Sequence, residues 1–297
     1  MRITQNLIYN RLQGMLSRNR EELAKYQQQL ASGKAVIRAS DGAVEFSTSR
    51  IIQEQIRKDG QYQSNINAGL RQARTVQESL DGMVDTLIDL KSTAVQGSND
   101  SIDAPEREKL AEQVVNVRER LMDLGNVQFN GVHLFGGTNT ENPVFSLNGA
   151  AAGGVEDVAN SDALVTRISE HNEVKTSVTG TELRATGSGD LFAMVENVED
   201  ALRANDRTAL NAELDNVESA LDHVTKLASR IGSNINRLEF VHDKYESGII
   251  EKEGEVSRLT DADYAEAISN FQKFETSYQA ALSAHSRMTR NTLLNYL

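Results

Sequence analysis

Cysteine is absent from the 297 residues, so the chain contains no disulfide, no thiolate metal site and no cysteine nucleophile. Tryptophan is also absent, proline occurs only twice, and aromatic residues make up 5% of the sequence. A hydrophobic core must therefore consist mainly of aliphatic side chains. The scarcity of proline, together with many alanine, leucine, glutamine, glutamate and arginine residues, favours long helices.

Positive charge is in short supply. The chain has 31 lysine and arginine residues against 43 aspartate and glutamate residues, which gives a formal net charge of −12. Nucleic-acid binding needs clustered basic side chains that displace counterions from phosphates, so this balance argues against a nucleic-acid partner. It argues equally against attachment to an anionic membrane surface.

Long hydrophobic runs are missing too. The N-terminal segment Met1–Leu7 has no apolar run of signal-peptide length, and 18 consecutive apolar residues occur nowhere. We therefore expect neither a cleaved apolar signal nor a membrane-inserted helix. The lack of such a signal does not exclude export by a route that requires no cleaved apolar signal.

The strongest positive signal is apolar spacing that alternates four and three residues. A repeat of 3.5 residues keeps one seam of a helix facing a partner, as in a left-handed coiled coil. Forty residues of such a helix would be about 60 Å long, which predicts a rod. The twelve positions of this stripe are Leu210, Leu214, Val217, Leu221, Val224, Ala228, Ile231, Ile235, Leu238, His242, Tyr245 and Ile249.

Two earlier stretches show the same rhythm. One extends from Ile66 to Ala94 and is broadened by further apolar positions, so that helix should be buried on more than one side. The other extends from Leu110 to Leu124. Asp103 can cap its free amides and Pro105 fits its first turn. The intervening segment 96–100 is then a turn between two antiparallel helices.

The middle of the chain, residues 136–190, is rich in glycine and contains Pro143. Within it, Ala163–Ile168 and Glu173–Val178 have the β-branched residues of short strands, flanked by turn signals. These features predict a small β-rich insertion, and the helical pattern resumes at Leu191.

Each end of the chain is an amphipathic helix with a single apolar stripe. The N-terminal stripe is Leu12, Leu16, Leu23, Tyr26 and Leu30, and the C-terminal stripe is Tyr264, Ile268, Phe271, Tyr278, Leu282 and His285. Neither stripe has a partner nearby in sequence, so we expect the two helices to pair and to be ordered fully only when subunits stack. An ordinary core helix is the alternative interpretation. Asn19 either fixes the register of the seam or faces solvent.

Residues suited to catalysis or metal binding form no recognisable site. The five histidines include neither an HExxH motif nor a close pair, so we expect no zinc site, and His242 and His285 are interpreted as packing residues. The glycine-rich segments 149–154 and 187–189 lack the lysine of a phosphate-binding loop. We predict no catalytic residue, no metal ligand, no cofactor and no enzymatic activity.

Several short motifs, taken in order, resemble the bacterial flagellin family, which includes the hook-associated proteins. Leu30–Lys34 and Arg38–Ala43 resemble the end of the first terminal helix and the loop that follows it. In the family this is a spoke-like loop, which implies spoke or turn roles for Ser32, Gly33, Arg38 and Asp41. Gly42 departs from the family pattern, where a second Asp is common. The later matching segments are Phe129–Gly131, Arg230–Glu239 and Asp261–Ala265.

The resemblance implies a mainly α fold: an elongated flagellin-like coiled-coil helical rod with paired N- and C-terminal helices and a small β-rich inserted domain. It implies a terminal coiled-coil core domain (1–45 plus 260–297), a helical rod domain (46–135 plus 191–259) and an outer β-rich domain (136–190). The segment Leu134–Thr140, followed by Pro143 and Phe145, resembles the hook-associated members that join hook to filament more than it resembles filament flagellins.

By this resemblance the chain is a structural subunit of the flagellum that forms the layer between hook and filament. The expected partners are further copies in the layer, the adjacent hook-associated protein, the filament flagellin and an export chaperone on the C-terminal region. Secretion through the flagellar type III apparatus is implied, with no nucleic acid and no membrane insertion. A short filament-forming flagellin is the main alternative. A cytoplasmic coiled-coil adaptor is a further one.

Overall fold

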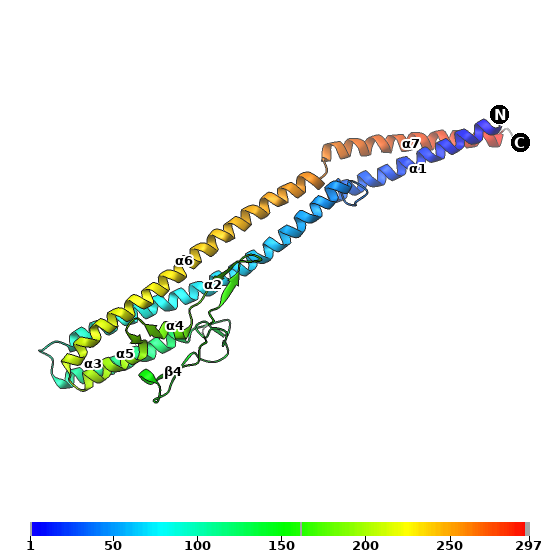
Figure 1. The fold of residues 1–297 in the computed structure, drawn as a ribbon. Coiled ribbons are helices and arrows are strands. Elements are labelled where there is room, and N and C mark those ends of the chain that lie inside the picture. Colours follow the sequence, from blue (N-terminus) through cyan, green and yellow to red (C-terminus); the bar gives the residue numbers. More distant parts are fainter. Residues whose placement is uncertain (1, 161, 295–297) are drawn as a thin grey trace. The chain divides into compact units, whose positions relative to one another are not determined.

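The structure is a computed structural model that describes residues 2–160 and 162–294. Long helices dominate it, and none of the described helices is long and apolar enough to cross a membrane. The helices are α1 (Arg2–Ser32), α2 (Ala43–Gly97), α3 (Ala104–Gly125), α4 (Gly180–Arg184), α5 (Leu191–Arg203), α6 (Arg207–Thr260) and α7 (Tyr264–Leu294). The mainly α fold class, with long terminal helices, is confirmed (Figure 1).

The strands are short and all lie between α3 and α5. They pair as antiparallel hairpins: β1 (Gln128–Phe129) with β2 (Val132–His133), β3 (Phe145–Leu147) with β4 (Val155–Asp157), β5 (Val165–Arg167) with β6 (Glu173–Lys175), and β7 (Ala185–Thr186) with β8 (Gly189–Asp190). A 3₁₀ turn, η1 (Ala152–Gly154), precedes β4. This confirms the small strand-containing insertion.

The chain forms two compact units. One comprises the described residues of 1–58 and 248–297, and the other comprises residues 59–247. The α2 and α6 helices each contribute one end to the first unit and the rest to the second. The three-domain division from the sequence stays a prediction.

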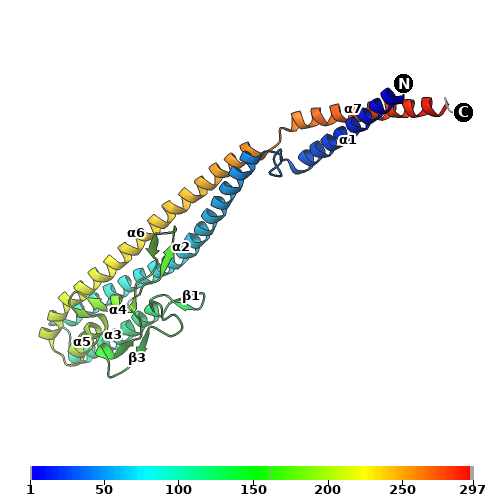
Figure 2. The ribbon, with the colours of Figure 1, turned by 45° about the vertical axis from the view of Figure 1, so that its right-hand side comes forward.

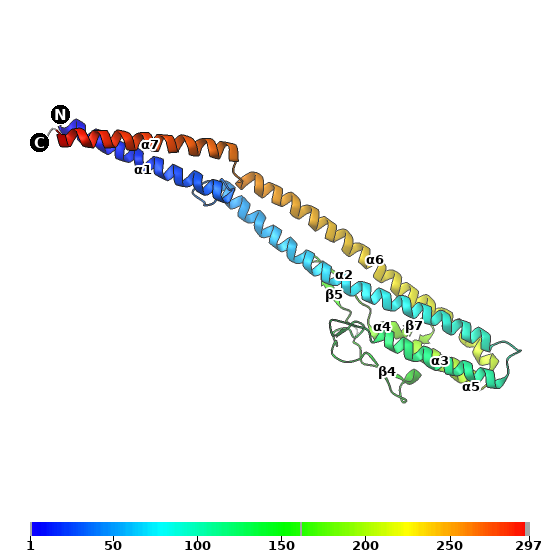
Figure 3. The same cartoon turned by 180° about the vertical axis from the view of Figure 1, so that it is seen from behind.

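The core of unit 59–247 lies where α2 and α6 run side by side and α3 and α5 pack beside them (Figure 3). The α6 stripe supplies Val217, Val224 and Ile231, each fully buried, and α2 supplies Leu80 and Leu87. All twelve predicted positions of the α6 stripe are buried or half-buried. The 3.5-residue repeat therefore identified the inward face of this helix correctly.

Side-chain caps fix where the helices of this unit begin. Asp103 accepts a hydrogen bond from Glu106 N at 3.0 Å at the start of α3, as predicted. Asp190 accepts from Phe192 N and Ala193 N at the start of α5. These carboxylates satisfy amides that have no partner inside the helix and oppose the positive end of its dipole.

The insertion contributes its own apolar residues to the same core. Phe145 on β3 is 1% exposed and meets Phe192 of α5 edge to face, with ring centroids 5.1 Å apart. The ring lies so close to α3 that a Cβ added to Gly125 would be 2.3 Å from it. The β3–β4 hairpin, which the sequence analysis missed, is therefore an integral part of the unit.

The β5–β6 hairpin packs on α2 and α6 beside the main core (Figure 2). Its Ile168 and Val174 lie against Ile66 and Leu238, and Tyr245 Oη donates to the Ile168 carbonyl at 2.8 Å. Both strands lie inside the predicted ranges but are shorter. Burial raises the pKa of Tyr245 above its ordinary value.

Candidate assembly surface of the paired terminal helices

The α1 and α7 helices lie side by side, so the residues near the two ends of the sequence pair as predicted (Figure 1). Two ring contacts mark the seam. Tyr26 stacks on Phe274 with centroids 5.7 Å apart, and Tyr9 meets the imidazole of His285 at 5.3 Å. These contacts join residues from the two ends of the sequence and set the register of the pair.

The α1 side of the seam follows the predicted stripe. The predicted α1 residues are all half-buried, and they share the inward face with Gln29, which is 9% exposed. They are Leu12, Leu16, Leu23, Tyr26 and Leu30. Asn19 is half-buried on the same face.

On α7 the predicted stripe mixed two faces. Phe271, Tyr278 and His285 are half-buried in the seam as expected. Ile268 and Leu282 are instead 45% and 44% exposed and lie outside it, so their assignment to the seam is corrected. Tyr264 is 55% exposed, but its ring lies beside Gly33 at the end of α1.

The α7 seam has a strict four–three spacing of its own: Ala267, Phe271, Phe274, Tyr278, Ala281 and His285. Ala267, Phe274 and Ala281 are absent from the stripe predicted from the sequence. Alanine lets two helix backbones approach closely and therefore suits a seam. Counting back from His285 in steps of four and three would have found this register.

The pair leaves apolar side chains on its outer faces. On α7 these are Tyr264, Ile268 and Leu282, and on α1 they are Leu7 and Met15, which are 51% and 53% exposed. Two helices have too little surface to cover all of these side chains with each other. The outer faces, defined by these five residues, are therefore available for further contacts.

The joint between the terminal helices and their continuations is built from two short loops. Gly33 follows α1 with φ +72°, a left-handed conformation that favours glycine. Its carbonyl accepts from Ala262 N at 2.9 Å, and Ala35 N donates to the Thr260 carbonyl at 2.7 Å. Lys34 forms an ion pair with Asp261 across the same joint.

The remaining predicted turn residues surround this joint. Ser32 Oγ accepts from Lys34 N at 3.2 Å. The Asp41 carboxylate accepts from Arg38 N at 2.8 Å and from Ile37 N at 3.1 Å, and the first of these bonds contributes most to lowering the pKa of that carboxyl. The Arg38 side chain is exposed. Ser32, Gly33 and Asp41 thus shape the turn through backbone contacts.

The Lys34–Asp261 pair gives a pH prediction. The hydrogen bond from Lys34 lowers the pKa of the Asp261 carboxyl, and Ser257 acts in the same direction. A carboxyl with a lowered folded-state pKa stabilises the fold above its unfolded pKa of about 3.9, and this contribution is lost as pH falls through the folded value. We expect Lys34→Met to move the Asp261 pKa upward, as followed by carboxyl carbon NMR. An unchanged titration in Lys34→Met would show that the pair does not hold this pKa.

Among the described residues of the terminal helix pair, no three histidine, aspartate or glutamate side chains come close enough together to hold a metal ion. What it does provide is a half-buried seam, apolar outer faces and a hydrogen-bonded joint. Such an arrangement suits a protein contact.

Comparison with known proteins identifies the two helical ends. The bacterial flagellin N-terminal helical region matches residues 3–140, and the bacterial flagellin C-terminal helical region matches residues 214–297. The chain belongs to the bacterial flagellin family. The members of this family are structural proteins of the flagellum, and so is this chain.

Two curated relatives span nearly the whole of this flagellin-family chain. Flagellar hook-associated protein 3 of Escherichia coli is 24% identical over 97% of this chain and 97% of its own length. Flagellin of Bacillus subtilis is 24% identical over 99% of both. The crystal structure of the flagellar junction protein FlgL from Legionella pneumophila has the same fold, with a TM-score of 0.62 and 14% identity over 72% of this chain and 99% of that one.

Proposed function

We propose that this flagellin-family chain forms the junction layer between the flagellar hook and filament. The proposal rests on the match to hook-associated protein 3 along almost the entire chain. The resemblance of the segment Leu134–Thr140 to hook-associated members supports it. That segment anchors the insertion. Leu134 and Phe135 are at most 1% exposed, and the Phe135 carbonyl accepts from Gly180 N at 2.6 Å.

Assembly would proceed through the terminal helices. The seam residues pair α1 with α7, and the outer faces then bury Tyr264, Ile268, Leu282, Leu7 and Met15 against neighbouring subunits. Burying a leucine or isoleucine side chain contributes about 1.5–3 kcal/mol, whereas ordering a residue costs about 1–2 kcal/mol of backbone entropy. For an isolated helix pair, the free energy gained by burial therefore roughly equals the entropy cost of ordering. Contacts with several neighbouring subunits make the ordered state favourable.

The same logic supports an export route and its partners. A subunit that travels unfolded through the flagellar export apparatus has to refold at its destination, which is fast for helices with local contacts and no disulfides. The C-terminal region, with its apolar outer face, would be held by an export chaperone before transit. In the layer, the partners would be copies of this chain, the adjacent hook-associated protein and the filament flagellin.

A short filament-forming flagellin is the second candidate, because the Bacillus subtilis flagellin matches the chain equally completely. Self-polymerisation separates the two functions. We expect the purified chain to form only short or capped assemblies, alone and on preformed flagellin seeds, when examined by electron microscopy. Flagellin under the same conditions serves as the control. Long filaments of this chain alone would favour the flagellin function.

A further inference from the structure

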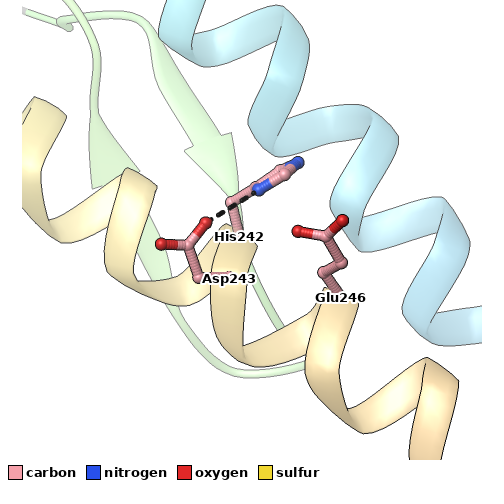
Figure 4. Close-up of side chains that lie close together, drawn as sticks. All are labelled: His242, Asp243 and Glu246. Atoms are coloured by element: carbon pink, nitrogen blue, oxygen red, sulfur yellow. Dashed lines mark hydrogen bonds and ion pairs between the residues drawn. The ribbon is translucent and has the colours of Figure 1, made fainter.

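Three potential metal ligands gather on α6, within unit 59–247. The imidazole of His242 and the carboxylates of Asp243 and Glu246 each offer a donor atom within 4.8 Å of the other two. Figure 4 shows the three side chains on one side of α6, with the imidazole extending toward α2. The set contains a single histidine, so the absence of an HExxH motif and of a close histidine pair did not reveal it.

The spacing places these groups well for a shared ligand. Residues four apart on a helix lie one above the other on the same face, so His242 and Glu246 can hold one ion from adjacent turns. Asp243 reaches the same point from the side, with Oδ1 3.3 Å from His242 Nδ1. The three donor atoms, all within 4.8 Å of one another, are near enough to share one ion after small side-chain adjustments.

The second nitrogen of the imidazole has a partner on the neighbouring helix. The side-chain amide of Gln63 on α2 lies 3.4 Å from His242 Nε2. In the structure the Gln63 nitrogen faces Nε2, and Nδ1 contacts Asp243 Oδ1. Metal binding through Nδ1 is accompanied by a half-turn of the Gln63 amide, which brings its oxygen to the Nε2 proton. That contact then orients the ligating imidazole and strengthens it as a ligand.

The surrounding groove has space for a hydrated cation and an excess of negatively charged side chains. His242 and Asp243 line an open groove of about 460 Å³, which can admit water as further ligands. Of the two arginines on this groove, Arg74 is already paired with Glu239 at 2.7 Å. Counting Arg71 as well, the groove and Glu246 hold two positive and three negative side chains, so the local charge favours a cation.

We propose that His242, Asp243 and Glu246 form a binding site for a divalent transition metal such as Zn²⁺ or Ni²⁺. Imidazole nitrogen combined with carboxylate oxygen suits these ions, whereas Ca²⁺ and Mg²⁺ prefer oxygen ligands alone. A bound ion clamps one turn of α6 and fixes the imidazole against Gln63. It thereby strengthens the contact between α6 and α2 inside this unit.

Calorimetric titration of the intact chain with Zn²⁺ and Ni²⁺ tests the site. We expect one equivalent to bind and the thermal midpoint of unfolding to rise with metal. His242→Gln keeps a polar side chain of similar size and should weaken binding about tenfold or more, and Gln63→Leu should weaken it about tenfold through loss of the outer contact. The matched control is His171→Gln, which removes an exposed imidazole elsewhere and should bind as the unsubstituted chain does.

Three results would overturn the proposal. One is that neither Zn²⁺ nor Ni²⁺ binds with a saturable equivalent. A second is equal affinity in the unsubstituted chain and His242→Gln, which would assign the binding to scattered surface carboxylates. Saturation of the unsubstituted chain by Ca²⁺ with the affinity shown for Zn²⁺ would likewise contradict a site that depends on imidazole.

Discussion

Removal of residues 270–297 is expected to abolish swimming while unit 59–247 stays folded. The deletion takes away most of the α7 seam, including Phe274 and Tyr278, and leaves α1 without its partner. No residue of either hydrophobic core cluster of unit 59–247 belongs to the deleted segment. The thermal unfolding of that unit, followed by circular dichroism, should therefore change little, while motility on soft agar is lost.

Point variants separate assembly from simple truncation damage. Ile268→Ser together with Leu282→Ser changes the outer face of α7 and spares the seam, so the helix pair should persist while filaments attach poorly. The matched control is Glu275→Gln, an exposed position on the same helix that should leave swimming unaffected. Normal motility in the truncated chain would refute the assignment of assembly to the terminal helices.

Long-range pairing in this fold was predictable where the apolar repeat is long and regular. Twelve α6 positions from Leu210 to Ile249 keep one register, and neither proline nor a charge interrupts them. A pattern of that length defines one face of a helix with little ambiguity. The pairing of the two ends followed because each had a stripe and no local partner.

Register was harder to predict where seam residues are small. Ala267 and Ala281 occupy the α7 seam, while the larger Ile268 and Leu282 lie one position further on and stay exposed. A search weighted by side-chain size selects the larger residues. Close helix packing selects the alanines instead, because they admit the partner backbone.

Contacts between distant parts of the sequence left no local signal. Lys34 and Asp261 are 227 residues apart, and the sequence around each residue does not predict their ion pair. The β3–β4 hairpin was missed although its strands are as long as those of the predicted β5–β6 hairpin. Strand β3 has no β-branched residue and β4 has one, so the composition gave no strand signal. The three residues of the His242 cluster, in contrast, lie within five positions of α6, and only their contact with Gln63 comes from a distant part of the sequence.

Truncation of one buried ring should destabilise unit 59–247 severely. Phe145→Ala removes a ring that packs on Phe192 and on the backbone at Gly125, and it leaves a cavity that rigid helices cannot fill. Substitutions of this kind cost about 3–5 kcal/mol, out of a total stability of about 5–15 kcal/mol for a typical domain. The measurement is urea unfolding followed by circular dichroism, with a lower midpoint and an unchanged slope.

The same hairpin supplies the control for that substitution. Leu147 lies two residues further along β3 and is 66% exposed, so Leu147→Ala removes a comparable apolar side chain that packs little. Its effect should stay within about 0.5 kcal/mol. Equal destabilisation by the two substitutions would show that the hairpin acts through strand pairing alone. A large effect confined to Phe145 would show that the insertion is held in place by the ring it buries between α3 and α5.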